Sequence, residues 1–345
     1  MDTETGEPVA IKRIANVFAH NIDAKRVLRE LKLLRHLSSH ENVISLLDIM
    51  TIPPEEAETF TDIYMVMELM DTDLHQIVKS NQALGQEHFV HFLFQILRAL
   101  KYTHSAGVIH RDLKPANVVL DASCETRVCD FGLARPTAVS GELFTEYVAT
   151  RWYRAPEIIF NSGVYSSAVD MWAVGCIFAE LLLRRPLLPG RDQVHQLSLI
   201  LSFCGTPSPQ EIADIRNENA RAYVQGHGFC DPQDMAAIFP NASEEAVDLL
   251  EKLLVFNPEE RLTAAQALAH PFFAELHEED NEPEASPFLD YAFEYEDAEA
   301  GKIRAHIYNE MLVYHPEISG PLIAASEEHL HHHGDDGEVS DMKIE

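Results

Sequence analysis

Three short motifs follow one another along the chain, and their order constrains the fold more than any other feature of the sequence. The first is VAIK, which ends at Lys12. The second is HRDLKPAN at residues 110–117, and the third is DFG at 130–132, followed by APE at 155–157. Each short motif arises by chance in unrelated proteins, but this order, with a glutamate-bearing helical stretch after the first, is specific. A helical protein that carries all of them by accident therefore has little support.

The N-terminal part of the chain reads as strands with one helix. Short β-branched or apolar stretches predict strands at 9–14, 43–50 and 63–69. Leucine and valine recur every three or four residues over 23–37, which predicts a helix. Glu30 lies on or beside the apolar stripe of that helix. It is either a glutamate at the edge of the stripe in water or a glutamate with a fixed cationic partner, because a buried charge needs one.

Beyond the third strand the pattern becomes helical. Helices are expected at 74–80, 87–105 and 167–183, and the last of these is apolar nearly all round, as in a large core. The chain therefore divides into a small strand-rich piece and a larger helical piece, with a break near 70–72. The acidic tail at 319–345 has little to bury and is expected to be disordered, with histidines that bind metal only adventitiously.

Charge and cysteine content narrow the class of protein. The 345 residues suffice for about two domains, and the net charge of −30 argues against nucleic acid or an anionic membrane as a direct partner. The five cysteines lack CxxC spacing, which indicates a reduced intracellular protein without zinc or a disulfide framework. The acidic start is neither a signal nor a transit peptide. The expected location is the cytoplasm, and the nucleus is also compatible.

In this order the motifs resemble the signature set of protein kinases, and the resemblance runs from about residue 5 to 318. It implies an α+β, two-lobed protein kinase fold. Residues 1–70 would form a partial, β-rich N-lobe with a hinge at 67–70, and residues 71–318 a larger, mainly helical C-lobe. ATP would bind between the lobes.

The resemblance also implies roles for residues that hold ATP and Mg²⁺. Phosphoryl transfer depends mostly on positioning and charge neutralisation. Lys12 would hold the α- and β-phosphates while Glu30 fixes its ammonium group. Asn117 and Asp130 would supply hard oxygen ligands for Mg²⁺. The other residues of the implied ATP site are Ala10, Met67, Glu68, Met70 and Val119.

The catalytic loop is of the serine/threonine-kinase form. Asp112 would orient the attacking hydroxyl and accept its proton, and Lys114 would neutralise the γ-phosphate. Thr150 would support these two residues, as in serine/threonine kinases. Structural pairs implied by the same resemblance are Asp170 with the catalytic loop and Glu157 with Arg261.

The segment between DFG and APE narrows the resemblance. Thr145-Glu146-Tyr147 resembles the dual-phosphorylation lip of a mitogen-activated protein kinase of the extracellular-signal-regulated (TEY) type, similar to plant and algal members. Each phosphate would add roughly −1.5 to −2 charges at neutral pH. Phosphorylated Thr145 would gather three arginines from the helix, the catalytic loop and the lip, and phosphorylated Tyr147 would meet two near the substrate pocket. In that order the arginines are Arg29, Arg111, Arg135, Arg151 and Arg154.

An acidic loop lies where the family docks basic-plus-apolar peptides of its substrates and phosphatases. A solvated acidic loop without a partner is the alternative. Asn281 stands where the family usually has aspartate, so docking would be weaker or would depend on the neighbouring acids. The expected docking residues are Glu278, Glu279, Asp280 and Glu282.

The resemblance implies a proline-directed serine/threonine kinase, monomeric and activated by an upstream dual-specificity MAP kinase kinase.

The family's glycine-rich phosphate loop is missing, since eleven residues precede Lys12 and no G-x-G-x-x-G occurs elsewhere. We expect a fragment or an incomplete gene model, and the alternative is a genuine short form. A catalytically weak docking or scaffold protein is thus the competing function. Cys129, directly before DFG, is a candidate for alkylation. Specific substrates, activator and stimulus are not indicated.

Overall fold

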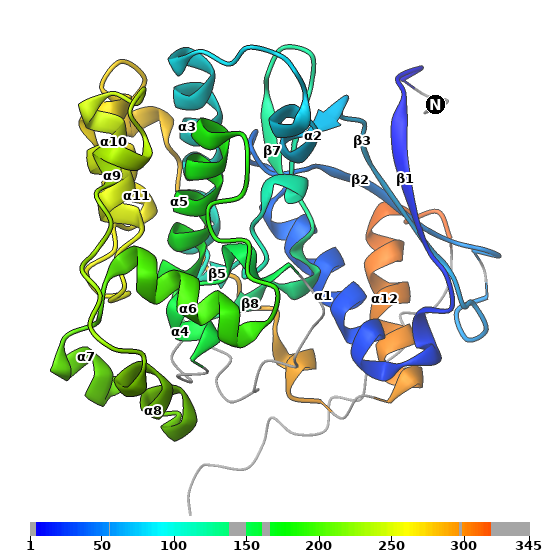
Figure 1. Cartoon of the computed structure of the whole chain (residues 1–345). Helices are drawn as coiled ribbons and strands as arrows, with labels where there is room; N and C mark the ends of the chain where they lie inside the picture. Colours follow the sequence, from blue (N-terminus) through cyan, green and yellow to red (C-terminus); the bar gives the residue numbers. More distant parts are fainter. Residues whose placement is uncertain (1–4, 55, 138–149, 161–165, 297–298, 319–345) are drawn as a thin grey trace, which may run out of the picture.

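The computed structural model describes residues 5–54, 56–137, 150–160, 166–296 and 299–318 of the chain (Figure 1). A small sheet and its helix lie beside a larger body of helices, so the two expected lobes are present. No helix in these ranges has the length and apolar character needed to cross a membrane.

The N-lobe sheet consists of β1 (Val9–Ile14), β2 (Leu46–Thr51) and β3 (Ile63–Glu68), antiparallel in the order β1-β3-β2. All three expected strands form, and β2 begins three residues later than expected. The delay has a structural reason, because Val43 bridges instead to Val128 in the C-lobe. The central strand β3 alternates buried and half-buried residues at its start, as expected of a strand that covers a core.

Helix α1 (Asn21–Leu37) confirms the expected helix and begins two residues earlier. It is buried on more than one side, because apolar side chains cover most of its circumference and further elements pack around them. Leu28, Leu31 and Leu34 are each 0% exposed. Glu30 is buried too, so the edge-of-stripe interpretation in water is wrong.

The C-terminal helix α12 (Ala300–Tyr314) returns to the N-lobe and packs against α1 and β2, as the orange helix beside the blue one in Figure 1 shows. The sequence placed residues 71–318 together in the C-lobe, and this helix departs from that division. Its apolar side chains at intervals of four residues face inward, and Thr51 donates a hydrogen bond to Met311 Sδ at 3.2 Å. The inward-facing residues are Ile303, Ile307 and Met311.

The C-lobe is built around α5 (Ala168–Leu183), whose residues from Ala168 to Leu181 are all buried, as its apolar sequence predicted. Helix α3 (Gln86–Ser105) packs beside it, and α10 (Glu244–Leu253) and α11 (Ala264–Leu268) lie against these two. The remaining helices are α2 (Leu74–Lys79), α4 (Pro156–Ile159), α6 (Gln193–Cys204), α7 (Pro209–Asp214), α8 (Glu218–Gly226) and α9 (Met235–Ile238).

Two small sheets hold the segments between the lobes. One is β4 (Thr72–Asp73), β6 (Val118–Leu120) and β7 (Thr126–Val128), and the other is β5 (Val108–Ile109) with β8 (Arg135–Pro136). They bracket both the HRDLKPAN and the DFG segments. The 3₁₀ turns are η1 (Val17–Ala19), η2 (Pro115–Asn117), η3 (Phe131–Leu133), η4 (Arg151–Tyr153), η5 (Pro271–Phe273), η6 (Glu279–Asn281) and η7 (Ala292–Glu294).

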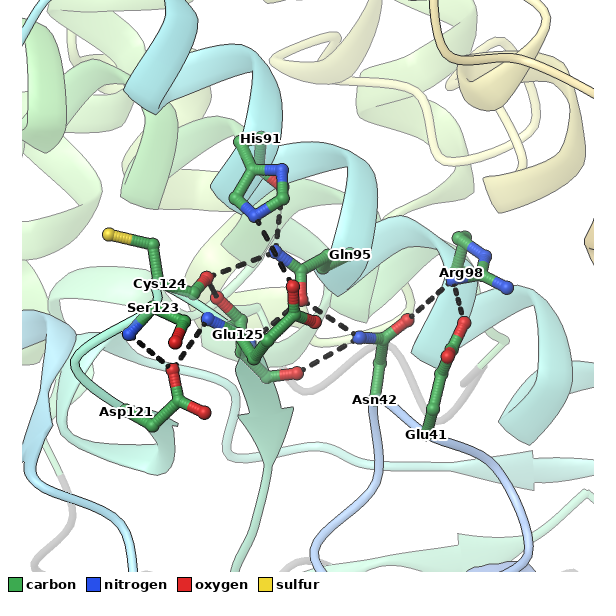
Figure 2. Close-up of polar contacts among 10 residues, drawn as sticks. Glu41, Asn42, His91, Gln95, Arg98, Asp121, Ser123, Cys124 and Glu125 are labelled. Atoms are coloured by element: carbon green, nitrogen blue, oxygen red, sulfur yellow. Dashed lines mark hydrogen bonds and ion pairs between the residues drawn. The ribbon is translucent and has the colours of Figure 1, made fainter.

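A polar network fixes the connection from α1 to the C-lobe (Figure 2). Asn42 Nδ2 donates to Gln95 Oε1 and to the carbonyl of Thr126, both at 3.0 Å. Gln95 Oε1 also accepts the backbone N–H of Thr126 at 2.7 Å. Arg98 binds Glu41 and donates to Asn42 Oδ1 at 3.2 Å. Because Asn42, Gln95 and Thr126 are buried and bonded to one another, the network ties the two lobes together on the side of α3.

His40, next to this network, should make stability depend on pH. Burial and the nearby charge of Arg98 lower the pKa of His40 to about 4, and its Nδ1 accepts the N–H of Asn42 at 3.0 Å. The ordinary pKa of histidine, which applies to the unfolded chain, is 6.5. Between about pH 4 and pH 6.5 the imidazole of His40 therefore binds a proton in the unfolded chain but not in the folded chain. The free energy of unfolding should therefore fall by roughly 3 kcal/mol as pH drops through this window. Urea unfolding of wild type and His40→Gln should show this slope only in wild type, and equal slopes would contradict it.

Candidate active site

Three polar side chains meet in the loop between β5 and η2. Lys114 Nζ lies 2.5 Å from Asp112 Oδ2. Asn117 Nδ2 donates to the carbonyl of Asp112 at 2.9 Å and reaches its Oδ2 at 3.3 Å. Asn117 is buried, whereas Asp112 and Lys114 are half-buried. The loop thus presents a carboxylate that is held by an ammonium and an amide but still reaches solvent.

Asp170 of α5 holds the backbone of this loop. It accepts the N–H groups of His110 and Arg111 at 2.8 Å each, and His104 Nε2 lies 2.9 Å from it. Arg111 has φ 71°, a left-handed conformation that few non-glycine residues adopt. Burial raises the pKa of Asp170, but the hydrogen bond and charge of His104, with His110 and the Arg111 amide, outweigh it and leave the pKa lowered. An ionised carboxylate in the core therefore stabilises the strained loop, as the sequence predicted.

Lys12 of β1 and Glu30 of α1 form the expected ion pair, with Nζ 2.7 Å from Oε1. Burial lowers the pKa of Lys12, but the charge and hydrogen bond of Glu30, together with Asp130, outweigh it and leave the pKa raised. Burial raises the pKa of Glu30, and Lys12 opposes that shift. The lysine is thus a fixed cation at neutral pH, paired with Glu30 and attracted by the charge of Asp130.

The DFG segment packs against α1, the helix that carries Glu30. Phe131 is 0% exposed and packs edge-on against the His110 ring at 4.9 Å. Asp130 has φ 65° and stays half-exposed, so its carboxylate is presented at the site while the next side chain is buried. The N–H of Cys129 donates to the carbonyl of Asn117 at 3.0 Å, which brings Asp130 next to Asn117.

These two residues can form part of a magnesium site. Both present hard oxygen atoms, and Mg²⁺ bound with nucleotide takes its remaining ligands from phosphates and water. Among the described residues, no group of three histidine, cysteine, aspartate or glutamate side chains is placed to bind a metal.

Burial raises the pKa of the Cys129 thiol to about 12, so this cysteine is a neutral thiol and a poor target for alkylation.

The residues expected around the adenine ring come together at the strand β3 side of the site. Ala10 pairs with Met67 across the β1–β3 ladder, and like Met70 and Val119 these two are half-buried. The Glu68 carboxylate is engaged within the fold, where it accepts the N–H of Ser45 at 2.8 Å and Arg127 Nε at 3.0 Å. The other four residues, Ala10, Met67, Met70 and Val119, contribute apolar surface.

Comparisons with known proteins agree with this geometry. A family model described as the protein kinase domain matches residues 1–273. Mitogen-activated protein kinase 1 of Oryza sativa subsp. japonica and mitogen-activated protein kinase 6 of Arabidopsis thaliana are each 51% identical over 317 residues, which is 92% of this chain and 78% and 79% of theirs. Mitogen-activated protein kinase 3 of Arabidopsis thaliana is 48% identical over 92% of this chain and 84% of its own. The chain belongs to the mitogen-activated protein kinase family. It is accordingly a serine/threonine protein kinase.

Two of the arginines expected to bind the phosphates of the kinase lip lie close together. Thr145 and Tyr147 lie outside the described residues. Arg29 and Arg135 do come together, but they meet on the carboxylate of Glu294, which the sequence analysis did not single out.

The substrate side of the kinase site is formed by residues just before APE. Thr150, Asp112, Arg111 and Arg154 line one hollow beside the catalytic loop. Burial lowers the pKa of Arg154, and the charge of Asp112 opposes that shift. Arg151 donates to the carbonyl of Arg191 at 3.1 Å. Thr150 and Asp112 thus line the same hollow, and a supporting role for Thr150 stays a prediction.

The acidic loop of the kinase divides into exposed and buried acids. Glu278, Glu279 and Asp280 are exposed. Glu282 is buried, with Oε2 3.2 Å from Lys101 Nζ and Oε1 2.7 Å from His277 Nδ1. The expectation that Glu282 docks peptides is therefore wrong for this arrangement, because its carboxylate is buried and already bound to Lys101 and His277.

Proposed function

We propose that this kinase transfers the γ-phosphate of ATP to serine or threonine followed by proline, within a MAP kinase cascade. The observation that carries the proposal is the catalytic-loop cluster, in which Lys114 and Asn117 hold the Asp112 carboxylate at 2.5 and 3.3 Å. The intact ion pair between Lys12 and Glu30, at 2.7 Å, supports an enzyme over a docking-only protein. The preference for proline rests on the resemblance to the family.

The residues divide the chemistry among them. Asp112 would accept the proton of the substrate hydroxyl, since its half-exposed carboxylate faces the hollow that Thr150 also lines. Lys114 would neutralise charge on the transferred phosphoryl group, and Lys12 would hold the phosphates behind it. Asn117 and Asp130 would hold Mg²⁺, which when bound offsets phosphate charge.

Activation and docking complete the proposal. We infer that an upstream dual-specificity MAP kinase kinase phosphorylates Thr145 and Tyr147. Basic docking peptides of substrates and phosphatases would bind the exposed acids Glu278, Glu279 and Asp280, whose clustered charge attracts them. A monomer in the cytoplasm, entering the nucleus as well, is the state in which we expect it to act.

Mg-ATP binding tests the site directly. Lys12→Met removes the phosphate-binding cation and should weaken Mg-ATP affinity about ten-fold or more, because charge-assisted contacts to phosphate are strong. Isothermal titration calorimetry of the purified chain measures this. The matched control is Arg13→Met, the same substitution one residue along β1, where the side chain is exposed and pairs with Asp62. Unchanged affinity in Lys12→Met, or an equal loss in both variants, would contradict the assignment.

A further inference from the structure

Four cations lie along one face of α1 and contact the C-terminal part of the chain. Their spacing of four, three and three residues places them on one side of a helix with 3.6 residues per turn. They contact α12 and the segment before it, residues 288–296. We call residues 288–296 the C-terminal strap. The cations are Lys25, Arg29, Lys32 and Arg35.

The strap is attached to α1 through both backbone and side chains. Lys25 Nζ donates to the carbonyls of Glu294 and Glu296, both at 2.9 Å. Lys32 Nζ lies 2.6 Å from Asp290 Oδ2. The strap is thus registered along the helix that carries Glu30, and its position and that of α1 depend on each other.

Glu294 is the buried centre of this attachment. Its side chain is 3% exposed, and both carboxylate oxygens bind Arg29, with Nη2 to Oε2 at 2.8 Å. Arg135 of β8 reaches the same carboxylate, with Nη1 3.3 Å from Oε1. A two-oxygen fork to one guanidinium is among the strongest polar contacts in proteins. One carboxylate therefore joins α1 to the strand that follows DFG.

The contact between Arg29 and Glu294 lies next to the ion pair of Lys12 and Glu30 in the sequence of α1. Arg29 precedes Glu30, and its Nη1 donates to the carbonyl of Gly132 at 3.2 Å. The strap, α1 and the DFG segment thus converge on a single guanidinium. Any rotation of α1 that withdraws Glu30 from Lys12 would also pull Arg29 away from Glu294.

We propose that Glu294 is a positioning residue that holds the kinase site assembled before the lip is phosphorylated. Its carboxylate bridges Arg29 and Arg135, two of the three arginines expected to bind the phosphate on Thr145. Glu294 supplies one negative charge where a phosphate supplies roughly −1.5 to −2. Once phosphorylated, Thr145 takes over the bridge, and the site no longer depends on the glutamate. This inference rests on the proposed activation by phosphorylation of the lip.

Glu310 of α12 offers a matched control. It is buried like Glu294 and pairs with cations of the same helix, Lys32 Nζ at 2.9 Å and Arg35 Nε at 2.7 Å. None of its contacts within the described ranges is with β8 or the DFG segment. Glu310→Gln therefore removes a buried carboxylate from the α1 face without removing the link to Arg135.

The test compares wild type, Glu294→Gln and Glu310→Gln, each unphosphorylated and doubly phosphorylated by a purified active MAP kinase kinase. Mass spectrometry verifies the phosphorylation, and kcat and KM are measured for ATP and a Ser-Pro peptide. Glu294→Gln should lower kcat/KM of the unphosphorylated form by about ten-fold and that of the phosphorylated form by less than about three-fold, as expected for a lost coupling energy of this size. Glu310→Gln should change both forms by the same factor.

An equal loss in both forms of Glu294→Gln would show that it only stabilises the fold, and no loss or a gain in the unphosphorylated form would also overturn the inference. Hydrogen exchange of α1 amides gives a readout that does not need turnover. Glu294→Gln should speed exchange in the unphosphorylated form, and phosphorylation should restore protection. If phosphorylation fails to activate wild type, the proposed activation is wrong. In that case the positioning role of Glu294 stands only if Glu294→Gln lowers kcat/KM of the unphosphorylated kinase and Glu310→Gln does not.

Discussion

Asp112→Asn should lower the rate of phosphoryl transfer by roughly 10³-fold, within the range expected for loss of a positioned proton acceptor. Asparagine has the same shape, so the hydrogen bond from Asn117 to the backbone of residue 112 at 2.9 Å is retained. What is lost is the negative charge that holds Lys114 at 2.5 Å and the basicity of the carboxylate that accepts the hydroxyl proton. The loss should appear in kcat, with Mg-ATP affinity nearly unchanged.

Single-turnover phosphorylation of a Ser-Pro peptide, with calorimetric titration of Mg-ATP alongside, separates these two quantities. Asp121→Asn is the matched control, since Asp121 caps the turn after β6 by accepting the N–H groups of Ser123 and Glu125 at 2.8 and 3.0 Å. It should leave the rate within about two-fold of wild type, as expected away from the site. A rate for Asp112→Asn within ten-fold of wild type would remove this residue from the proposed chemistry.

The sequence predicted the catalytic centre well because its groups lie within short motifs. Lys114 and Asn117 are two and five residues from Asp112, so local backbone geometry brings them together once the loop forms. Helical periodicity placed Glu30 on or beside the apolar stripe and left its partner open, and the kinase resemblance implied the pair with Lys12. A buried carboxylate needs a cation, and Lys12 supplies it. Their roles in catalysis remain predictions.

The sequence did not predict the strap, because its contacts join residues far apart in the chain. Arg29 and Glu294 are 265 positions apart, and Glu294 stands in a run of acids that looks like a solvated surface. The signal that was present is the row of cations on a helix with many leucines, because any cation buried with those leucines needs a carboxylate partner. Glu282 shows the same limit, since composition cannot tell which acid of a cluster turns inward to meet Lys101.

Arg261→Leu should lower the free energy of unfolding by roughly 3–5 kcal/mol, because it leaves the buried carboxylate of Glu157 without its cation. The guanidinium is 0% exposed and lies 2.9 Å from Glu157 Oε1. It also donates to the carbonyls of Ala168 at 2.6 Å and Val255 at 3.0 Å, and lies 5.2 Å from the Trp172 ring. One side chain thus ties the APE segment to α5 and to the loop after α10.

Urea unfolding of the variants at neutral pH measures this loss, with exposed Arg216→Leu as the control, expected within about 0.5 kcal/mol of wild type. The double variant Glu157→Gln/Arg261→Leu decides the cause. If the unpaired charge dominates, adding Glu157→Gln to Arg261→Leu should restore about 1 kcal/mol or more, since neighbouring residues couple non-additively. Additive losses would instead mean that the carbonyl bonds and the contact with Trp172 carry the stability, and that the ion pair contributes little.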